Sequence, residues 1–340
     1  MNNSLRIFVK SRGTRLDYDS IFLVYLPLIA VLLFLTFPTN FSAGISSIIF
    51  MKLSLGHVVI GHLRVALIQN VKKQFGIKVL SVSIIFIAMT TASDEFFWFS
   101  FLIGLVWTHY HYMRQHYGVA RLLTVKNLLG NYRENQLDQI FFATAYFAPI
   151  FYFVPSYVFN PSTINGALLS GGMHRSIWWV MSLFEWAIKI TSVLWWPMIA
   201  FWLCYLARIF LQYRTDRLQL KKFLFALFLL GSTLFSFYFL PASLAVMASV
   251  VIHSLQYYYL VSKDQIKNNP AKGVAFAIMI PVLIGLSFGF FFGYFDQDAF
   301  LQNRSPAMRF LCGLGIALGL IHFWMDSFIW KRKNLESAQL

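Results

Sequence analysis

Residues 221–262 read KKFLFALFLLGSTLFSFYFLPASLAVMASVVIHSLQYYYLVS, and this stretch decides the class of fold. No Asp, Glu, Lys or Arg occurs after its second residue. Each half is therefore apolar over the roughly 20 residues that a helix needs to cross a bilayer. Pro241 separates the two halves and favours a turn. The stretch predicts two membrane-spanning helices, 221–240 and 242–262, joined by a tight turn.

The rest of the chain has the same character. Of its 340 residues, 58% are hydrophobic and only 12% are charged, and the mean hydropathy is +0.63. A soluble domain carries about 25% charged residues, so this composition predicts an integral membrane protein. Eight further spans are predicted at 21–38, 43–66, 78–93, 97–121, 138–155, 177–206, 273–293 and 307–330. The expected fold is an all-α polytopic bundle of about ten transmembrane helices, or eight if a short span is re-entrant.

The net charge of +15 does not indicate a nucleic-acid partner, because the basic residues lie in short loops between apolar spans. Lys and Arg are concentrated in alternate loops, which by the positive-inside rule places both termini in the cytoplasm. We therefore expect a cytoplasmic N-terminal segment (1–20), a single transmembrane domain (21–330) and a cytoplasmic tail (331–340). The expected location is a bacterial inner (cytoplasmic) membrane.

No loop is long enough to fold as a soluble domain. The longest predicted loops are 122–137, 156–176 and 207–220. Any chemistry is therefore expected within the membrane or at its inner face. The partner that reaches such a site most simply is a hydrophobic small molecule or a membrane lipid.

Seven of the eight histidines lie inside the apolar spans. Ionisable side chains at membrane depth are costly and usually mark a functional site, and imidazole is the commonest metal ligand. Counted inward from the outer ends of four spans at about 1.5 Å per residue, one histidine of each span falls within a slab roughly 6 Å thick. These four histidines are the predicted metal ligands: His57, His109, His253 and His322.

Three more histidines are candidate additional ligands. His62 and His116 lie one to two turns further inward, and His116 shares a helix face with His109 at i, i+7 spacing. His111 points roughly the other way on the same helix. His174 lies in an outer loop and is not assigned to the site.

Polar residues beside the ligands are expected to orient them. Asp326 follows His322 by four residues, so its carboxylate can accept the second imidazole N–H; the alternative is an ion pair with Lys331 or Arg332. Gln256 and Tyr257 share a helix face with His253 at i, i+3, i+4 spacing. We expect these three residues to surround the metal ligands.

The ligand types narrow the metal. There is no set of cysteines, which argues against a structural zinc or an iron–sulfur centre. An all-imidazole site suits iron, copper or zinc. Haem is a further alternative, because two histidines on facing helices suffice as axial ligands.

The runs IHSLQYY from Ile252 and IHFWMD from Ile321 resemble the late motifs of the Brp/Blh membrane proteins of bacteria and archaea. The resemblance implies a β-carotene 15,15′-dioxygenase that makes retinal and holds iron, as Fe(II), through histidines. Its counterparts here are His57, one of the three histidines of span 97–121, His253, and His322 with the acid four residues later.

The resemblance covers four short motifs, and the chain departs from the family at two of them. The early motif reads GHVVIGH from Gly56, without a nearby acid. Tyr257 or Tyr258 occupies the position of the family's second late histidine. These departures favour a distant relative over a retinal-forming enzyme.

The leading hypothesis is an iron-dependent oxygenase, an oxidoreductase of dioxygenase type that acts on a carotenoid or another isoprenoid or lipid. One alternative is a transporter or assembly subunit whose histidines carry protons or stabilise packing. Another is a haem-binding electron-transfer protein.

Overall fold

The computed structural model describes residues 18–36, 56–58, 60–61, 72–123, 132–153, 178–213, 217–240, 242–268 and 306–329. These residues are helical almost throughout and contain no strand, which confirms the all-α class. The elements are η2 (Ser20–Tyr25, a π-helix), α1 (Leu26–Leu35), α3 (Lys72–Ala92), α4 (Asp94–Leu123), α5 (Tyr132–Phe153), α9 (Trp178–Tyr213), α10 (Arg217–Phe239), α11 (Ala242–Asn268) and α14 (Pro306–Ile329). The short segments 56–58 and 60–61 are also helical.

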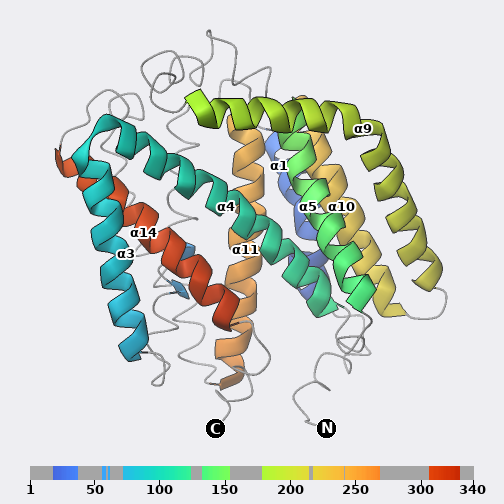
Figure 1. Ribbon diagram of the computed structural model, residues 1–340. Coiled ribbons are helices and arrows are strands. Elements are labelled where there is room, and N and C mark those ends of the chain that lie inside the picture. Colours follow the sequence, from blue (N-terminus) through green and yellow to red (C-terminus); the bar gives the residue numbers. More distant parts are fainter. Residues whose placement is uncertain are drawn as a thin grey trace.

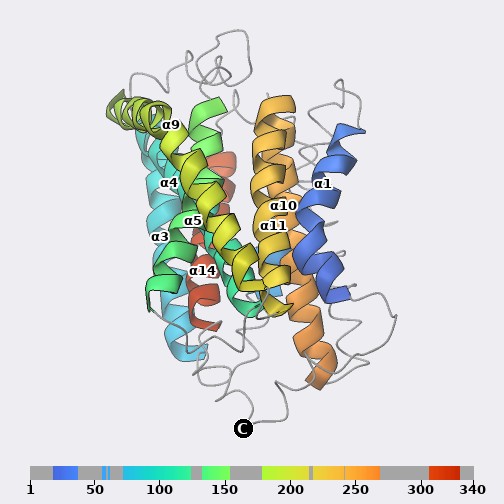
Figure 2. The same cartoon turned by 90° about the vertical axis from the view of Figure 1, so that its right-hand side faces the viewer.

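The helices form a bundle in which two groups of three pack together. Helices α3, α4 and α14 contact one another, and so do α5, α9 and α10. Helix α11 runs through the middle and packs against α1, α4 and α10 (Figures 1 and 2). Helix α4 joins the two groups because it also contacts α5 and α10.

A buried aromatic cluster holds the second group together. Phe141 of α5 stacks on Tyr205 of α9 with ring centroids 4.1 Å apart. Phe142 stacks on Phe225 of α10 at 5.8 Å, and Trp202 of α9 is 1% exposed in the same cluster. Large aromatic side chains bury much apolar area, so this cluster is the main apolar contact of α5, α9 and α10.

Prolines mark the starts and the bend of the helices. Pro27 lies in the first turn of α1, directly after η2. Pro306 begins α14, a position where the missing N–H has no helical partner to lose. Pro197 lies inside the 36-residue helix α9. The first part of α9 crosses one end of the bundle, and the helix then bends to run along it (Figures 1 and 2). A proline inside a helix commonly causes such a bend.

Two helical segments are long and apolar enough to cross a membrane: Glu185–Gln212 in α9 and Leu220–Phe239 in α10. Three shorter apolar helices occur as well, at Ser20–Leu35, Gly76–Ala92 and Arg309–Trp324. Ten spans thus remain a prediction. The predicted span 273–293, most of span 43–66, the turn at Pro241 and both predicted cytoplasmic termini lie outside the described residues.

Helices α3 and α5, predicted as short spans, contain 21 and 22 residues. These helices are longer than the predicted spans because they include polar residues at their ends. The run YRENQ from Tyr132 opens α5, although no apolar pattern marks it. An apolar stretch gives the length that lipid requires, whereas Arg, Glu and Gln have good helix propensity and prolong the helix beyond it.

Helix α14 approaches α3 very closely at one glycine. A Cβ atom on Gly313 would overlap the Thr90 hydroxyl and the α3 backbone at Phe86 and Ile87. A small residue at this crossing lets the two backbones meet. The contact fixes the position of α14, the helix that carries His322 and Asp326.

Candidate metal centre

His57, His111, His322 and Asp326 form a buried group that could hold a metal ion, and their ligand atoms all lie within 4.8 Å of one another. We call these four residues the histidine–aspartate group. His57 comes from the helical segment 56–58, His111 from α4, and the other two from α14. None of the four is more than 6% exposed. Residues from three separate segments therefore meet in one buried site.

The distances within the group suit a small central ion. His57 Nε2 lies 2.5 Å from His322 Nε2. Asp326 Oδ2 lies 3.5 Å from His322 Nε2 and 3.6 Å from His111 Nε2. Two nitrogens bound at about 2.0–2.1 Å to one ion, at angles near those of a tetrahedron or octahedron, lie about 3 Å apart. The observed separations lie on both sides of that value.

His253 of α11 adjoins the group. Its Nε2 lies 3.3 Å from His57 Nε2, and it is fully buried. Its ring centroid is 4.4 Å from that of His57 and 4.7 Å from that of His111. Three of the four histidines predicted at one depth, His57, His253 and His322, therefore lie together in space.

Neighbouring side chains hold the group in place. The Tyr257 hydroxyl donates to Asp326 Oδ1 at 3.3 Å, and its ring lies 4.4 Å from that of His57. Phe323 stacks on His111 at 4.1 Å. A Cβ atom on Gly61 would overlap the His322 imidazole, so glycine is what allows this segment to approach α14.

His111 is the α4 residue that reaches the group, and His109 lies elsewhere. His109 is half-buried, and its Nδ1 lies 2.9 Å from the Tyr146 hydroxyl. Successive helical residues are rotated by about 100°, so residues two apart face in nearly opposite directions. The depth estimate placed His109 along its helix but contained no information about which face points inward.

The other predicted residues occupy varied positions. Asp326, expected beside the ligands, lies within the group itself, and Tyr257 lies beside it. Gln256 donates through Nε2 to the Leu23 carbonyl at 3.4 Å. His116 lines a separate small cavity. His62 and His174 lie outside the described residues.

The donor set fits a metal ion. It comprises imidazoles and one carboxylate without thiolate, a set that suits iron, zinc or copper. His111 Nε2 is buried and has no hydrogen-bond partner among the residues that the structure describes. An unsatisfied buried nitrogen is costly, and a bound ion would satisfy it. The geometry does not select among these metals.

A second buried polar site, the ion-pair cluster of Asp138, Tyr205 and Lys222, was not predicted from the sequence. Lys222 Nζ of α10 lies 2.7 Å from both carboxylate oxygens of Asp138 of α5. The Tyr205 hydroxyl of α9 donates to Asp138 Oδ1 at 2.8 Å. All three residues are buried. The only available signal was an acid inside a mostly apolar segment, which commonly has a basic partner.

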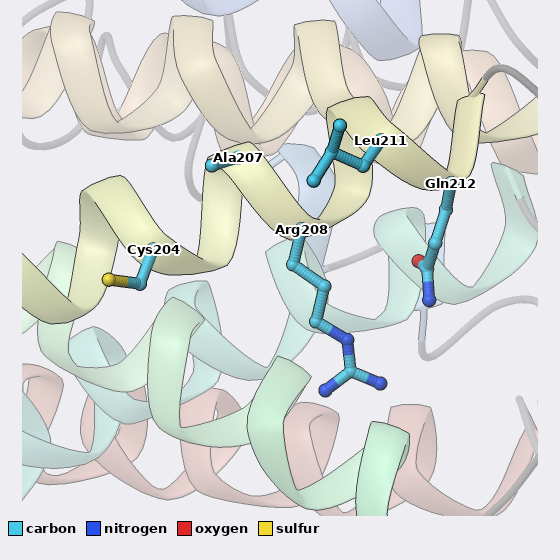
Figure 3. A pocket seen from close by; sticks show the side chains of 5 residues that line it. All are labelled: Cys204, Ala207, Arg208, Leu211 and Gln212. Carbon is cyan, nitrogen blue, oxygen red and sulfur yellow. The ribbon is translucent and has the colours of Figure 1, made fainter.

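A hollow also lies along the outer face of α9, lined by Cys204, Ala207, Arg208, Leu211 and Gln212 (Figure 3). All five residues belong to one helix, and the side chains of Arg208 and Gln212 project to the same side (Figure 3). None of them belongs to the histidine–aspartate group. This hollow is therefore separate from the candidate metal centre.

No family model matches the chain, and neither does a curated protein or a solved structure. The resemblance to the Brp/Blh proteins accordingly rests on the short motifs alone.

Proposed function

We propose that the protein is a membrane-embedded oxygenase that binds Fe(II) through the histidine–aspartate group and oxidises a hydrophobic substrate. The substrate class is a carotenoid, another isoprenoid or a lipid. One observation carries the proposal: His57, His111, His322 and Asp326 converge from three segments, with their ligand atoms within 4.8 Å, in a buried site. Such convergence is costly unless something binds at its centre.

The mixed donor set favours iron used for oxygen chemistry. Histidines with one carboxylate are the usual ligands of non-haem Fe(II) oxygenases, which keep positions open for substrate and dioxygen. Haem is disfavoured because axial nitrogens at about 2 Å on either side of the iron would lie about 4 Å apart. The Nε2 atoms of His57 and His322 are only 2.5 Å apart, which leaves no room for a macrocycle between them.

Exposed apolar side chains support a membrane location. On α9, Val193 is 78% exposed and Trp196 is 75% exposed. Continuous apolar surface of this kind is stable in lipid and not in water. A hydrophobic substrate would then reach the site from the bilayer, and the bacterial inner membrane remains the expected location.

The residues around the site would hold and protect the reacting centre. Bound iron would supply Lewis acidity and the ability to activate dioxygen. Tyr257 would fix the orientation of Asp326 through its 3.3 Å hydrogen bond, and Phe323 would fix that of His111 by stacking. Burial of Tyr257, Asp326 and His111 excludes water from the site, which strengthens electrostatic interactions there.

The resemblance to the Brp/Blh proteins suggests the class of substrate, but it does not specify the product. Either Tyr257 or Tyr258 occupies the position of that family's second late histidine, and Tyr257 contacts both His57 and Asp326. Asp326 would supply the ligand that a histidine supplies there. Carotenoid binding follows from this resemblance, and retinal as the product is not part of the proposal.

Metal analysis of the full chain, purified in detergent, tests the proposal. We expect about one equivalent of iron per chain after expression with iron, because the group offers one compact set of ligands. His322→Ala should lose this metal, since Nε2 of His322 lies closest to that of His57.

His109→Ala is the matched control, because His109 lies on α4 outside the group. It should keep the wild-type metal content. A folded wild-type protein without stoichiometric metal would overturn the proposal, and so would equal losses in the two variants. With metal bound, oxygen uptake on adding β-carotene in micelles would separate an oxygenase from a transporter or assembly subunit.

A further inference from the structure

A small polar cavity lies between α4, α5, α10 and α11, apart from the candidate metal centre. Its polar lining consists of His116, Tyr146, Ser232, Thr233, Ser236 and Ser249. Its volume available to the centre of a water molecule is about 10 Å³. That volume holds about one water molecule. All six of these residues are buried.

Three of the hydroxyl groups that line the cavity donate to backbone carbonyls. Ser232 and Thr233 both donate to the Leu229 carbonyl, at 2.9 and 2.8 Å. Ser249 donates to the Ala245 carbonyl at 3.4 Å. Their oxygens can therefore only accept hydrogen bonds from the cavity. The cavity therefore suits a ligand that donates hydrogen bonds to these oxygens.

His116 is the residue that most needs such a ligand. It is 1% exposed, and neither ring nitrogen has a hydrogen-bond partner among the described residues. The Gln256 side chain approaches His116 without reaching hydrogen-bonding geometry. A water molecule can donate to two hydroxyl oxygens and still exchange a hydrogen bond with imidazole. A cation fits less well, because no carboxylate lines the cavity and a buried charge needs a partner.

We propose that the cavity binds one water molecule, which bridges His116 and the Tyr146 hydroxyl. The same hydroxyl also lies 2.9 Å from His109 Nδ1. Tyr146 and His116 are both 1% exposed, so the water would be held inside the bundle. The water site does not depend on the proposed oxygenase activity or on a bound metal.

Radiolytic labelling of the full chain in detergent, with X-ray-generated hydroxyl radicals in H₂¹⁸O, tests for the bound water. Radicals formed from a bound water label the side chains that touch it. We expect Tyr146 to be labelled well above Phe141, although Phe141 is also fully buried. Ser236→Val and Ser249→Val should abolish the labelling, because each adds volume and removes an acceptor.

Ser83→Val is the matched control, because Ser83 is buried on α3 away from the cavity. It should leave labelling of Tyr146 unchanged. Wild-type labelling of Tyr146 no higher than that of Phe141 would overturn the proposal. Labelling that persists in both cavity variants would also overturn it. The wild-type measurement needs no variant to fold, and metal content should be unchanged in all three variants.

Discussion

The ion-pair cluster and the histidine–aspartate group are both buried polar sites between helices, yet their charged atoms lie at different distances. In the ion-pair cluster, Lys222 Nζ lies 2.7 Å from both oxygens of Asp138. In the histidine–aspartate group, Asp326 Oδ2 lies 3.5 Å from His322 and 3.6 Å from His111. Charge-assisted hydrogen bonds are about 2.7–2.9 Å long, so the contacts of Asp326 with these two imidazoles are longer than hydrogen bonds of that kind, whereas those of Asp138 with Lys222 are not.

This is the difference expected between a structural site and the proposed metal centre. Opposite charges at hydrogen-bond distance satisfy each other and need no further ligand. Two neutral imidazoles can share one N–H between them, whereas a cation at the centre could be bound by all the imidazoles and the carboxylate at once. The ion-pair cluster also adjoins the aromatic cluster of α5, α9 and α10, where it can stabilise packing. Three predictions would break or sharpen this comparison.

The largest effect is expected from breaking the ion pair. Asp138→Ala leaves the Lys222 ammonium buried without its partner, which costs about 3–5 kcal/mol. The free energy of unfolding, followed by thermal denaturation in detergent, should fall by that amount. The double variant Asp138→Ala, Lys222→Met should recover most of the loss, because it removes the stranded charge. Additive losses in the double variant would show that the pair is not coupled and that the comparison fails.

The two sites also differ in how well they could be predicted from the sequence. Histidines are rare enough in apolar helices to be noticed singly, and three of the four predicted ligands do lie together. The sequence does not predict the ion-pair cluster, because Lys222 begins an apolar stretch and resembles an ordinary basic residue of an inner loop. Its partner lies 84 residues away in the chain, and no local pattern reports such a contact.

Prediction from the sequence was sound for the fold class and weaker for helix faces. Apolar runs longer than a bilayer leave the backbone no satisfied structure except a helix, so the all-α class followed directly. The choice between His109 and His111 depended on the rotation of α4 about its axis. That rotation is set by packing against α5, α10 and α14, which the spacing of residues in α4 cannot supply.

An intermediate effect is expected from Gly61→Ala in the histidine–aspartate group. The new methyl group would overlap the His322 imidazole and lie 3.0 Å from the Tyr257 hydroxyl. Overpacking of this kind costs about 1–3 kcal/mol. We expect a modest loss of thermal stability but a complete loss of bound metal, because His322 must move.

Gly231→Ala on α10 is the control for this change. Nothing lies within 4 Å of the Cβ position at Gly231 among the described residues, so alanine should be neutral or stabilise the helix by up to about 1 kcal/mol. Metal content in this control should match that of the wild type. Full metal content in Gly61→Ala would show that His322 is not needed as a ligand.

The smallest effect on stability, and the most specific one, is expected from Tyr257→Phe. The change removes the hydroxyl that donates to Asp326 and keeps the ring beside His57. This hydrogen bond is 3.3 Å long and therefore weaker than the 2.8 Å bond of Tyr205, so its loss should cost about 1 kcal/mol of stability. Loss of a partner that orients a metal ligand typically weakens metal affinity by about 10–100-fold, which competition with a chelator of known affinity would measure.

Tyr205→Phe is the same substitution in the ion-pair cluster, where the hydroxyl donates to Asp138 at 2.8 Å. It removes a hydrogen bond to a charged group and should cost about 1.5–3 kcal/mol of stability while leaving metal affinity unchanged. The two tyrosines should thus respond in opposite ways, one mainly in metal affinity and the other mainly in stability. If both variants weaken metal binding equally, the loss comes from general loosening of the bundle. The histidine–aspartate group would then be a packing feature like the ion-pair cluster, because only a metal centre makes the Asp326 hydrogen bond matter more for binding than for folding.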